Sequence, residues 1–156
     1  MAARKPVVFV AGKYQQLQAG DTIDASCNEV DIITLENEEG ADAIVKGMAV
    51  YISSAGKVKK AKADAVGTRD VIALCLTDSV AAGQSGSMQT DGQITIADWT
   101  AVIGAAALVA GSLYYLSEAT SGKLTATPPA TGSVVEIGIA ISTVMMDINI
   151  KQPILL

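Results

Sequence analysis

The chain has 156 residues, of which 17% are charged and 50% hydrophobic, and its formal net charge at pH 7 is -5. This length suffices for one domain with a substantial core, and a charged fraction below the typical ~25% predicts that part of the surface is buried against other subunits. The sequence contains no histidine, which excludes Ser-His-Asp and Cys-His catalytic arrangements and removes the commonest metal ligand.

The charges are grouped along the chain. Residues 1–13 carry three bases and no acid, residues 14–45 carry eight acids and no base, and residues 46–62 carry five lysines. This grouping favours contact with another copy or with an oppositely charged partner, although the solvated faces of a soluble domain would give the same pattern. Because the total is acidic and the lysines lack interleaved aromatic residues, no nucleic-acid partner is expected.

Residues 1–13 are predicted to form an N-terminal arm with a first strand. The arm contains the basic pair Arg4 and Lys5, and the run Val7-Val8-Phe9-Val10 that follows is typical of a strand. Such an arm is free to dock on a neighbour, or its first residues can lack fixed structure, as chain termini often do. The apolar run is too brief for a signal peptide. A further strand, polar in character, is expected from Tyr14 to Gln18.

Residues 14–156 are predicted to form a single β domain with an internal duplication. Residues 47–58 read Gly, three residues, Tyr, an aliphatic residue and Ser, followed by a turn that ends in Gly-Lys, and residues 111–124 repeat this order. Downstream, residues 71–77 and 136–142 both carry large aliphatic side chains at alternate positions, as strands do. The duplicated unit is therefore assigned to residues 47–77 and 111–142.

Further strands are expected at residues 30–35, 57–62, 134–141 and 144–150. The dipeptide Asp91-Gly92 between two apolar runs predicts a hairpin. Asp98 could cap a short helix that runs to Ala107, but Gly104 makes a loop nearly as probable. The prolines in residues 127–132 exclude a central strand there. The C-terminal Ile154-Leu155-Leu156 is expected to lie clamped on its own domain or on a neighbour.

No catalytic, cofactor or metal site is predicted, and the chain is not expected to be an enzyme. The acidic residues stand in turn contexts that need no catalysis to explain them, and residues 83–87 lack the Lys and the helix of a phosphate-binding loop. Cys27 and Cys75 are interpreted as free buried residues, with a disulfide as the alternative. Trp99 is either a core residue or an interface anchor. The apolar stretch 101–111 is too short to span a membrane, so no membrane partner is expected.

Several motifs together resemble those of a known protein family. The pattern Gly111-x-x-Tyr114-Tyr115-Leu116-Ser117, then Gly122-Lys123-Leu124-Thr125, Pro128, Gly138-x-Ala140, Asp147-Ile148 and the Ile154-Leu155-Leu156 end, is similar to the C-terminal portion of tailed-bacteriophage virion proteins, notably head decoration (capsid cement or head-fibre) proteins. Residues 12–21 also resemble phage head and tail structural proteins. The likeness covers most of the chain and is best over residues 47–156.

The resemblance implies a non-enzymatic β protein on the outer surface of the phage head, made in the host cytoplasm. It would bind the major capsid protein and stabilise its lattice, commonly as a homotrimer. The residues expected to contact the shell or a neighbouring copy are Arg4, Lys5, Phe9, Lys59, Lys62, Leu155 and Leu156. The rival interpretation is a tail-fibre or receptor-binding module that recognises a host surface glycan through exposed aromatic residues.

The predicted fold class is all-β. We expect a barrel or sandwich of about ten to twelve short antiparallel strands, built from two related halves, with at most one short helix.

Overall fold

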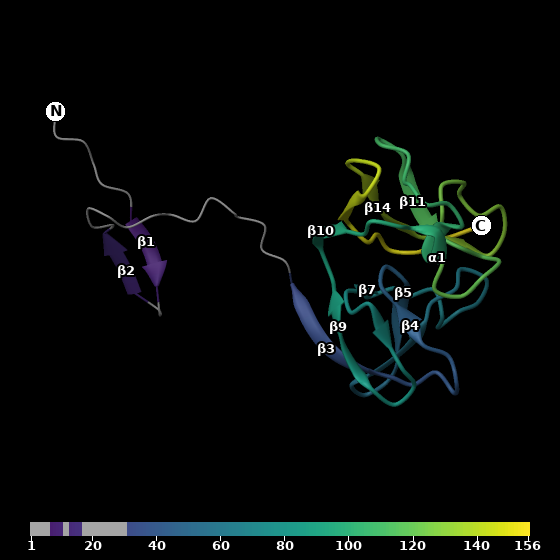
Figure 1. The fold of residues 1–156 in the computed structure, drawn as a ribbon, viewed down its shortest axis with the longest axis horizontal. Helices are drawn as coiled ribbons and strands as arrows, with labels where there is room; N and C mark the ends of the chain where they lie inside the picture. The colour runs from purple at the N-terminus through teal and green to yellow at the C-terminus, as the bar shows by residue number, and fades with distance from the viewer. Residues whose placement is uncertain (1–6, 11–12, 17–30) are drawn as a thin grey trace.

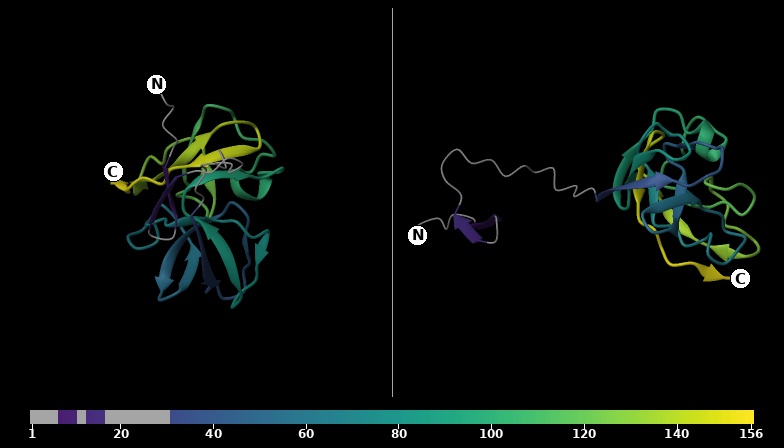
Figure 2. Two further views of the ribbon diagram at one scale, coloured as in Figure 1. Left: turned by 90° about the vertical axis from the view of Figure 1, so that its left-hand side faces the viewer. Right: turned by 90° about the horizontal axis from the view of Figure 1, so that it is seen from below.

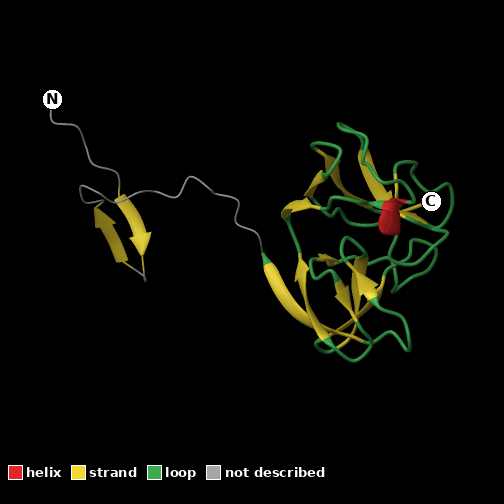
Figure 3. Cartoon of the chain, viewed as in Figure 1, coloured by secondary structure: helices red, strands yellow, loops and turns green. Residues whose placement is uncertain are grey.

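The computed structural model describes residues 7–10, 13–16 and 31–156, and these residues are almost entirely β (Figures 1 and 3). The predicted all-β class is confirmed. The strands are β1 (Val7–Val10), β2 (Lys13–Gln16), β3 (Ile32–Asn37), β4 (Ile44–Val45), β5 (Ala49–Ser54), β6 (Lys57–Lys60), β7 (Ala73–Cys75), β8 (Ser79–Val80), β9 (Ser85–Gln89), β10 (Gly92–Thr95), β11 (Leu113–Leu116), β12 (Leu124–Thr125), β13 (Ser133–Val134), β14 (Glu136–Ala140), β15 (Met145–Ile148) and β16 (Ile154–Leu155). The helix is α1 (Thr100–Ile103).

The described residues contain more strands than the ten to twelve expected. The excess comes from two-residue strands, such as β4 paired with β8 and β13 paired with β16. Two residues leave no readable alternation in a sequence, so the pairing of β4 with β8 and of β13 with β16 could not be foreseen. The strand expected at Val7 to Val10 is present as β1, and it pairs antiparallel with β2 in a two-stranded sheet.

The first lobe consists of β3 to β9, residues 32–89, and contains a closed barrel in the order β3-β6-β5-β7-β9. All neighbours in the barrel are antiparallel except β3 and β6, which run parallel and pair Glu36 with Lys57. The barrel interior is filled by one of two apolar clusters, made of Ile44, Val50, Val58, Ala73, Cys75, Val80 and Met88. The first lobe therefore has a core of its own.

The second lobe, β10 to β16, repeats the strand order of the first. Its main sheet runs β10-β15-β14-β11-β12. Read from β3 through β9, the barrel of the first lobe runs β3-β9-β7-β5-β6. When the five strands of each sheet are numbered in chain order, both therefore have the spatial order first, fifth, fourth, second, third. The registers agree as well: Ala49 pairs with Leu74 in the first lobe, and the corresponding Leu113 pairs with Ile139 in the second. On the neighbouring strand, Gln89 of β9 pairs with Leu74, and Asp147 of β15 pairs with Ile139 in the same way. The two lobes are thus built on one β pattern.

The second sheet stays open between β10 and β12, where the first lobe closes by pairing β3 with β6. Here the segment around α1 supplies apolar side chains to the sheet's inner side, among them Trp99 and Val102, both buried. The indole Nε1–H of Trp99 donates to the Val144 carbonyl oxygen at 3.2 Å. Trp99 is therefore a core residue that helps to fill the unclosed lobe.

The two lobes share the larger apolar cluster and lie one against the other (Figures 1 and 2). Ala49 and Leu74 on the outside of the first barrel belong to the cluster that also holds Tyr114, Leu116 and the rest of the second sheet's inner side. Backbone hydrogen bonds cross the junction, for example from the Ala49 N–H to the Gly122 carbonyl oxygen at 2.9 Å. The second sheet therefore packs its inner face on the outer face of the first lobe.

The hairpin predicted at Asp91-Gly92 is wrong. Strand β9 pairs with β3 and β7, whereas β10 pairs with β15, so the two strands belong to different lobes. Gly92 does adopt a positive φ of 77°, a conformation that glycine enters without steric cost. The chain uses this bend to cross between lobes because the edges of β9 are already taken.

The short helix is present but ends earlier than residue 107. It spans Thr100–Ile103, and Gly104 stops it in the left-handed conformation. Asp98 lies one residue before the N-cap, Trp99, and accepts hydrogen bonds from the Thr100 N–H and hydroxyl at 2.9 and 2.6 Å. These two donors lower the pKa of the Asp98 carboxyl.

One expectation about strand faces needs correction. Ile137 was grouped with Ile139 and Ile141 on one bulky face of its strand, but Ile137 is buried in the core while the other two are exposed. The pairing of β11 with β14 shifts register between Tyr114 and Tyr115, which leaves Ile137 as an extra residue. A β-bulge of this kind re-aims a side chain, and here it turns Ile137 inward.

Candidate binding surfaces

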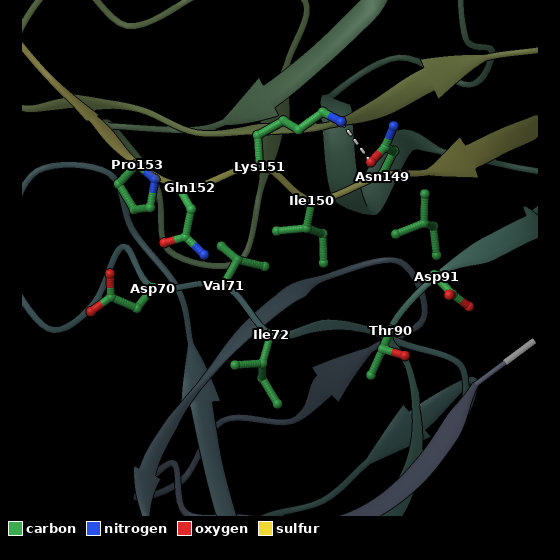
Figure 4. Close-up of a pocket in the computed structure, with 11 residues that line it drawn as sticks. Asp70, Val71, Ile72, Thr90, Asp91, Asn149, Ile150, Lys151, Gln152 and Pro153 are labelled. Atoms are coloured by element: carbon green, nitrogen blue, oxygen red, sulfur yellow. Dashed lines mark hydrogen bonds between the residues drawn. The ribbon is translucent and has the colours of Figure 1, made fainter.

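A cleft of about 440 Å³ opens at the seam between the lobes (Figure 4). One wall comes from Asp70 to Ile72 before β7, the end is formed by Thr90 and Asp91 at the crossover, and the other wall is residues 148–153 after β15. Figure 4 shows the side chain of Ile150 pointing toward the segment that carries Val71 and Ile72. Val71 and Ile150 both pack on the shared core, so the cleft floor is part of the lobe junction.

Several polar groups of this cleft form hydrogen bonds within the chain. The Lys151 ammonium donates to Asn149 Oδ1 at 2.9 Å, and the Asp91 carboxylate accepts from the Asp31 N–H at 3.2 Å. In the part of the chain that the structure describes, no cluster of three or more His, Cys, Asp or Glu side chains is placed to hold a metal ion.

The lysine strand β6 faces acids of its own chain. Lys57 Nζ lies 2.9 Å from Glu36 Oε1, and Lys60 Nζ lies 3.3 Å from Asp42 Oδ2. The Glu36 carboxylate raises the pKa of Lys57 by hydrogen bonding and by charge attraction. The parallel pairing of β3 with β6 therefore brings the acidic and basic blocks of the sequence together within one lobe.

Of the two lysines expected at an interface, only one is without a described ion pair. Lys62 bonds to Asp64, whereas Lys59, in β6 opposite Tyr51, has no ion pair among the described residues. Arg4 and Lys5 lie outside the described residues, and for Phe9 only the backbone strand is described. The structure therefore describes only some of the predicted interface residues, and it does not bring these together on one element.

The C-terminal residues form a second exposed surface. Strand β16 pairs with β13 of the same chain, and the Leu156 N–H donates to the Gly132 carbonyl oxygen at 3.2 Å. The backbone of the tail is therefore held on its own domain, as expected. Its side chains are not covered, since Ile154, Leu155 and Leu156 are 63–66% exposed.

A third surface, missed by sequence reasoning, is the outer face of the second lobe. It presents Leu113, Ile139 and Ile141 with exposures of 38%, 40% and 47%. We define this outer face by Leu113, Tyr115, Ile139, Ile141, Met145 and Asp147 on strands β11, β14 and β15 and at the end of β14. The signal in the sequence was the alternation itself, but alternation does not say which of two faces a neighbour covers.

The exposed aromatic residues that a glycan site would need are scarce. Trp99 and Tyr114 are buried in the core, and the Tyr114 hydroxyl accepts a hydrogen bond from the Val109 N–H at 3.0 Å. Tyr51 and Tyr115 remain half-buried on outer strand faces. Stacking of a sugar ring requires an accessible aromatic face, so within residues 31–156 only these two tyrosines could contribute one.

Cys75 is a buried free cysteine inside the first barrel. Burial raises the pKa of its thiol to about 11, which makes it a packing residue, because thiolate is the reactive form. Cys27, its predicted alternative disulfide partner, lies outside the described residues. Over the described residues, no helix has the length and apolar character required to cross a membrane.

Comparison with known proteins returned no match: no family model fits the sequence, and the search of curated proteins found no relative.

Proposed function

We propose that this chain is a structural virion protein that decorates the outer surface of a tailed-phage head and stabilises the lattice of the major capsid protein. Its partners in this proposal are the major capsid protein and further copies of the chain, assembled as a homotrimer. The motif resemblance over residues 47–156 motivates the proposal. The observation that carries it is a β body with two uncovered apolar surfaces, the β16 tail and the outer face, and with its tryptophan buried.

The physical role of such a protein follows from mass action. A ligand that binds only the mature shell stabilises that shell by an amount that grows with the ligand concentration. Exposed aliphatic side chains held on a fixed backbone suit this purpose, because their burial against the shell is favourable and little chain entropy is lost. The β16 tail meets this description, since its backbone is paired with β13 while its side chains are free.

The test adds purified protein to expanded heads of the phage whose structural genes adjoin the gene for this chain. The expected result is saturable binding and a rise in the temperature at which the heads release DNA. The double variant Leu155→Ser, Leu156→Ser should bind more weakly, while Val66→Ser, which removes an 80% exposed aliphatic residue elsewhere, should bind as the wild type does.

Absence of binding to heads would contradict the proposal. Retention by host cells or by a host surface glycan, with no affinity for heads, would instead support the receptor-binding alternative. The two half-buried tyrosines, Tyr51 and Tyr115, would then be the residues to substitute first.

A further inference from the structure

The duplicated architecture contains an asymmetry that points to a binding surface. Ala49, Leu74 and Gln89 form a row across three strands of the first lobe, and all three are buried. The corresponding row in the second lobe is Leu113, Ile139 and Asp147. One row is covered by a β surface of the same chain, while the other has no cover in the structure.

A pair of glycines shows the same asymmetry independently. Gly47 and Gly111 stand at equivalent places before β5 and β11, with φ values of 86° and 80°. A methyl group built at Gly47 would lie 2.6 Å from Ile96 and 2.9 Å from Val102, which belong to the second lobe. At Gly111 the same methyl group would meet no atom within 4 Å. The surface that the second lobe covers on the first is therefore open on the second.

We infer that the outer face of the second lobe is where a second copy of this chain docks. This deepens the self-association part of the proposed function, on which it rests, and does not depend on binding to a shell. The choice of occupant follows from the molecule itself, because the equivalent face of the first lobe is already covered by β structure of this chain. Another copy presents a β surface of the same kind.

The distribution of polarity on the outer face fits a contact between protein chains. The apolar residues lie on β11 and β14, and Asp147 and Gln93 lie on the adjoining strands β15 and β10. An apolar centre with a polar rim is the usual anatomy of a protein interface.

The experiment is sedimentation velocity of the full chain over a range of concentrations. Wild type and Val66→Asp are expected to sediment as the same assembly, and Ile139→Asp as a monomer of 15.9 kDa. Val66→Asp is the control, because it introduces the same acidic residue at an exposed aliphatic position away from the outer face. If Ile139→Asp does not fold, the milder pair Leu113→Ala, Ile139→Ala serves instead, with an expected rise of at least tenfold in the dissociation constant.

Three outcomes would overturn the inference: a wild type that is monomeric at all concentrations, an Ile139→Asp variant that keeps the wild-type assembly, or an assembly that is lost when residues 1–16 are deleted. The last would assign the contact to the N-terminal segment. Head binding is measured separately with the same variants. A wild type that associates through this face but ignores heads would leave the inference standing and contradict the proposed function, whereas an assembled variant that loses head binding would assign the face to the shell.

Discussion

The two lobes share a strand order and register yet differ in how each is completed. The first closes on itself through β3 and β6 and encloses a core of its own, whereas the second stays open and is completed by α1 and by the outside of the first lobe. Equivalent residues therefore have different surroundings, as Leu74 and Ile139 show. The lesson is that a duplicated sequence pattern fixes strand pairing but does not fix which side of each sheet is buried.

The largest expected effect comes from the equivalent pair in these strands. Leu74→Ala should lower the free energy of unfolding by about 2–5 kcal/mol, because it leaves a cavity in the shared core. Ile139→Ala, measured at a concentration where the protein is monomeric, should cost about 1 kcal/mol or less, because that side chain is 40% exposed. Urea denaturation of both variants gives the comparison, and equal losses would refute the asymmetry between the lobes.

The glycine pair sharpens the comparison further. Both Gly47→Ala and Gly111→Ala force a side chain into the left-handed backbone region, at a similar cost. Only Gly47→Ala also drives a methyl group against Ile96 and Val102, which should add about 1–3 kcal/mol of overpacking. The midpoint difference between the two variants in thermal unfolding measures the contact between the lobes. A larger loss for Gly111→Ala would contradict the packing described.

The third prediction concerns pH. Cys75 occupies the position in the first lobe that Ala140 occupies in the second, and burial raises its thiol pKa to about 11 from an ordinary value of 9.0. As pH rises, the unfolded chain loses this proton first, so stability is unaffected below about pH 9 and declines as pH approaches 11. Cys75→Ala should show a shallower alkaline loss than the wild type in denaturant titrations. Because the two proteins differ only at residue 75, the difference between their slopes isolates the thiol, and identical slopes would refute the prediction.

The smallest effect is expected at the closure of the first lobe. Lys57→Met removes the ion pair with Glu36, whose side chains are both more than a third exposed, and such pairs contribute little. The loss should be a small fraction of that at Gly47, and it should become smaller still in 1 M NaCl, where the screening length is about 3 Å. A large loss that persists in high salt would mean that the aliphatic part of Lys57, not its charge, holds β6 in place.

Much of the fold could be predicted because it is written in local patterns. The Gly-x-x-x-Tyr repeats gave the hairpins β5-β6 and β11-β12, and alternation gave β14 and β15. What failed involved long-range choices. The Asp91-Gly92 dipeptide has the residues of a hairpin turn, but the edges of β9 are taken by β3 and β7, and no local signal reports that competition. The parallel pairing of β3 with β6 was equally hidden.

The candidate binding surfaces could likewise be predicted only in part. Exposed Leu155 and Leu156 were identified because terminal aliphatic residues stand out in a sequence, whereas the outer face was missed because Ile139 and Leu74 look alike until the lobes are docked. The grouped charges were expected to meet another copy, an oppositely charged partner or solvent, and the structure places Glu36 and Asp42 of the same chain beside the lysine strand. Charge blocks distant in sequence can neutralise each other in space, which a linear pattern does not reveal.

The closure of the first lobe also has a consequence during synthesis. All five strands of its barrel are complete once residue 89 has left the ribosome, so this lobe can fold while the second is still being made. At the usual translation rate of about 5–20 residues per second, residues 90–148, 59 in number, take about 3–12 s to follow. For that interval the nascent barrel presents Ala49 and Leu74 to solvent, which makes this sheet face a natural contact for chaperones and for pairing between neighbouring chains on one polysome.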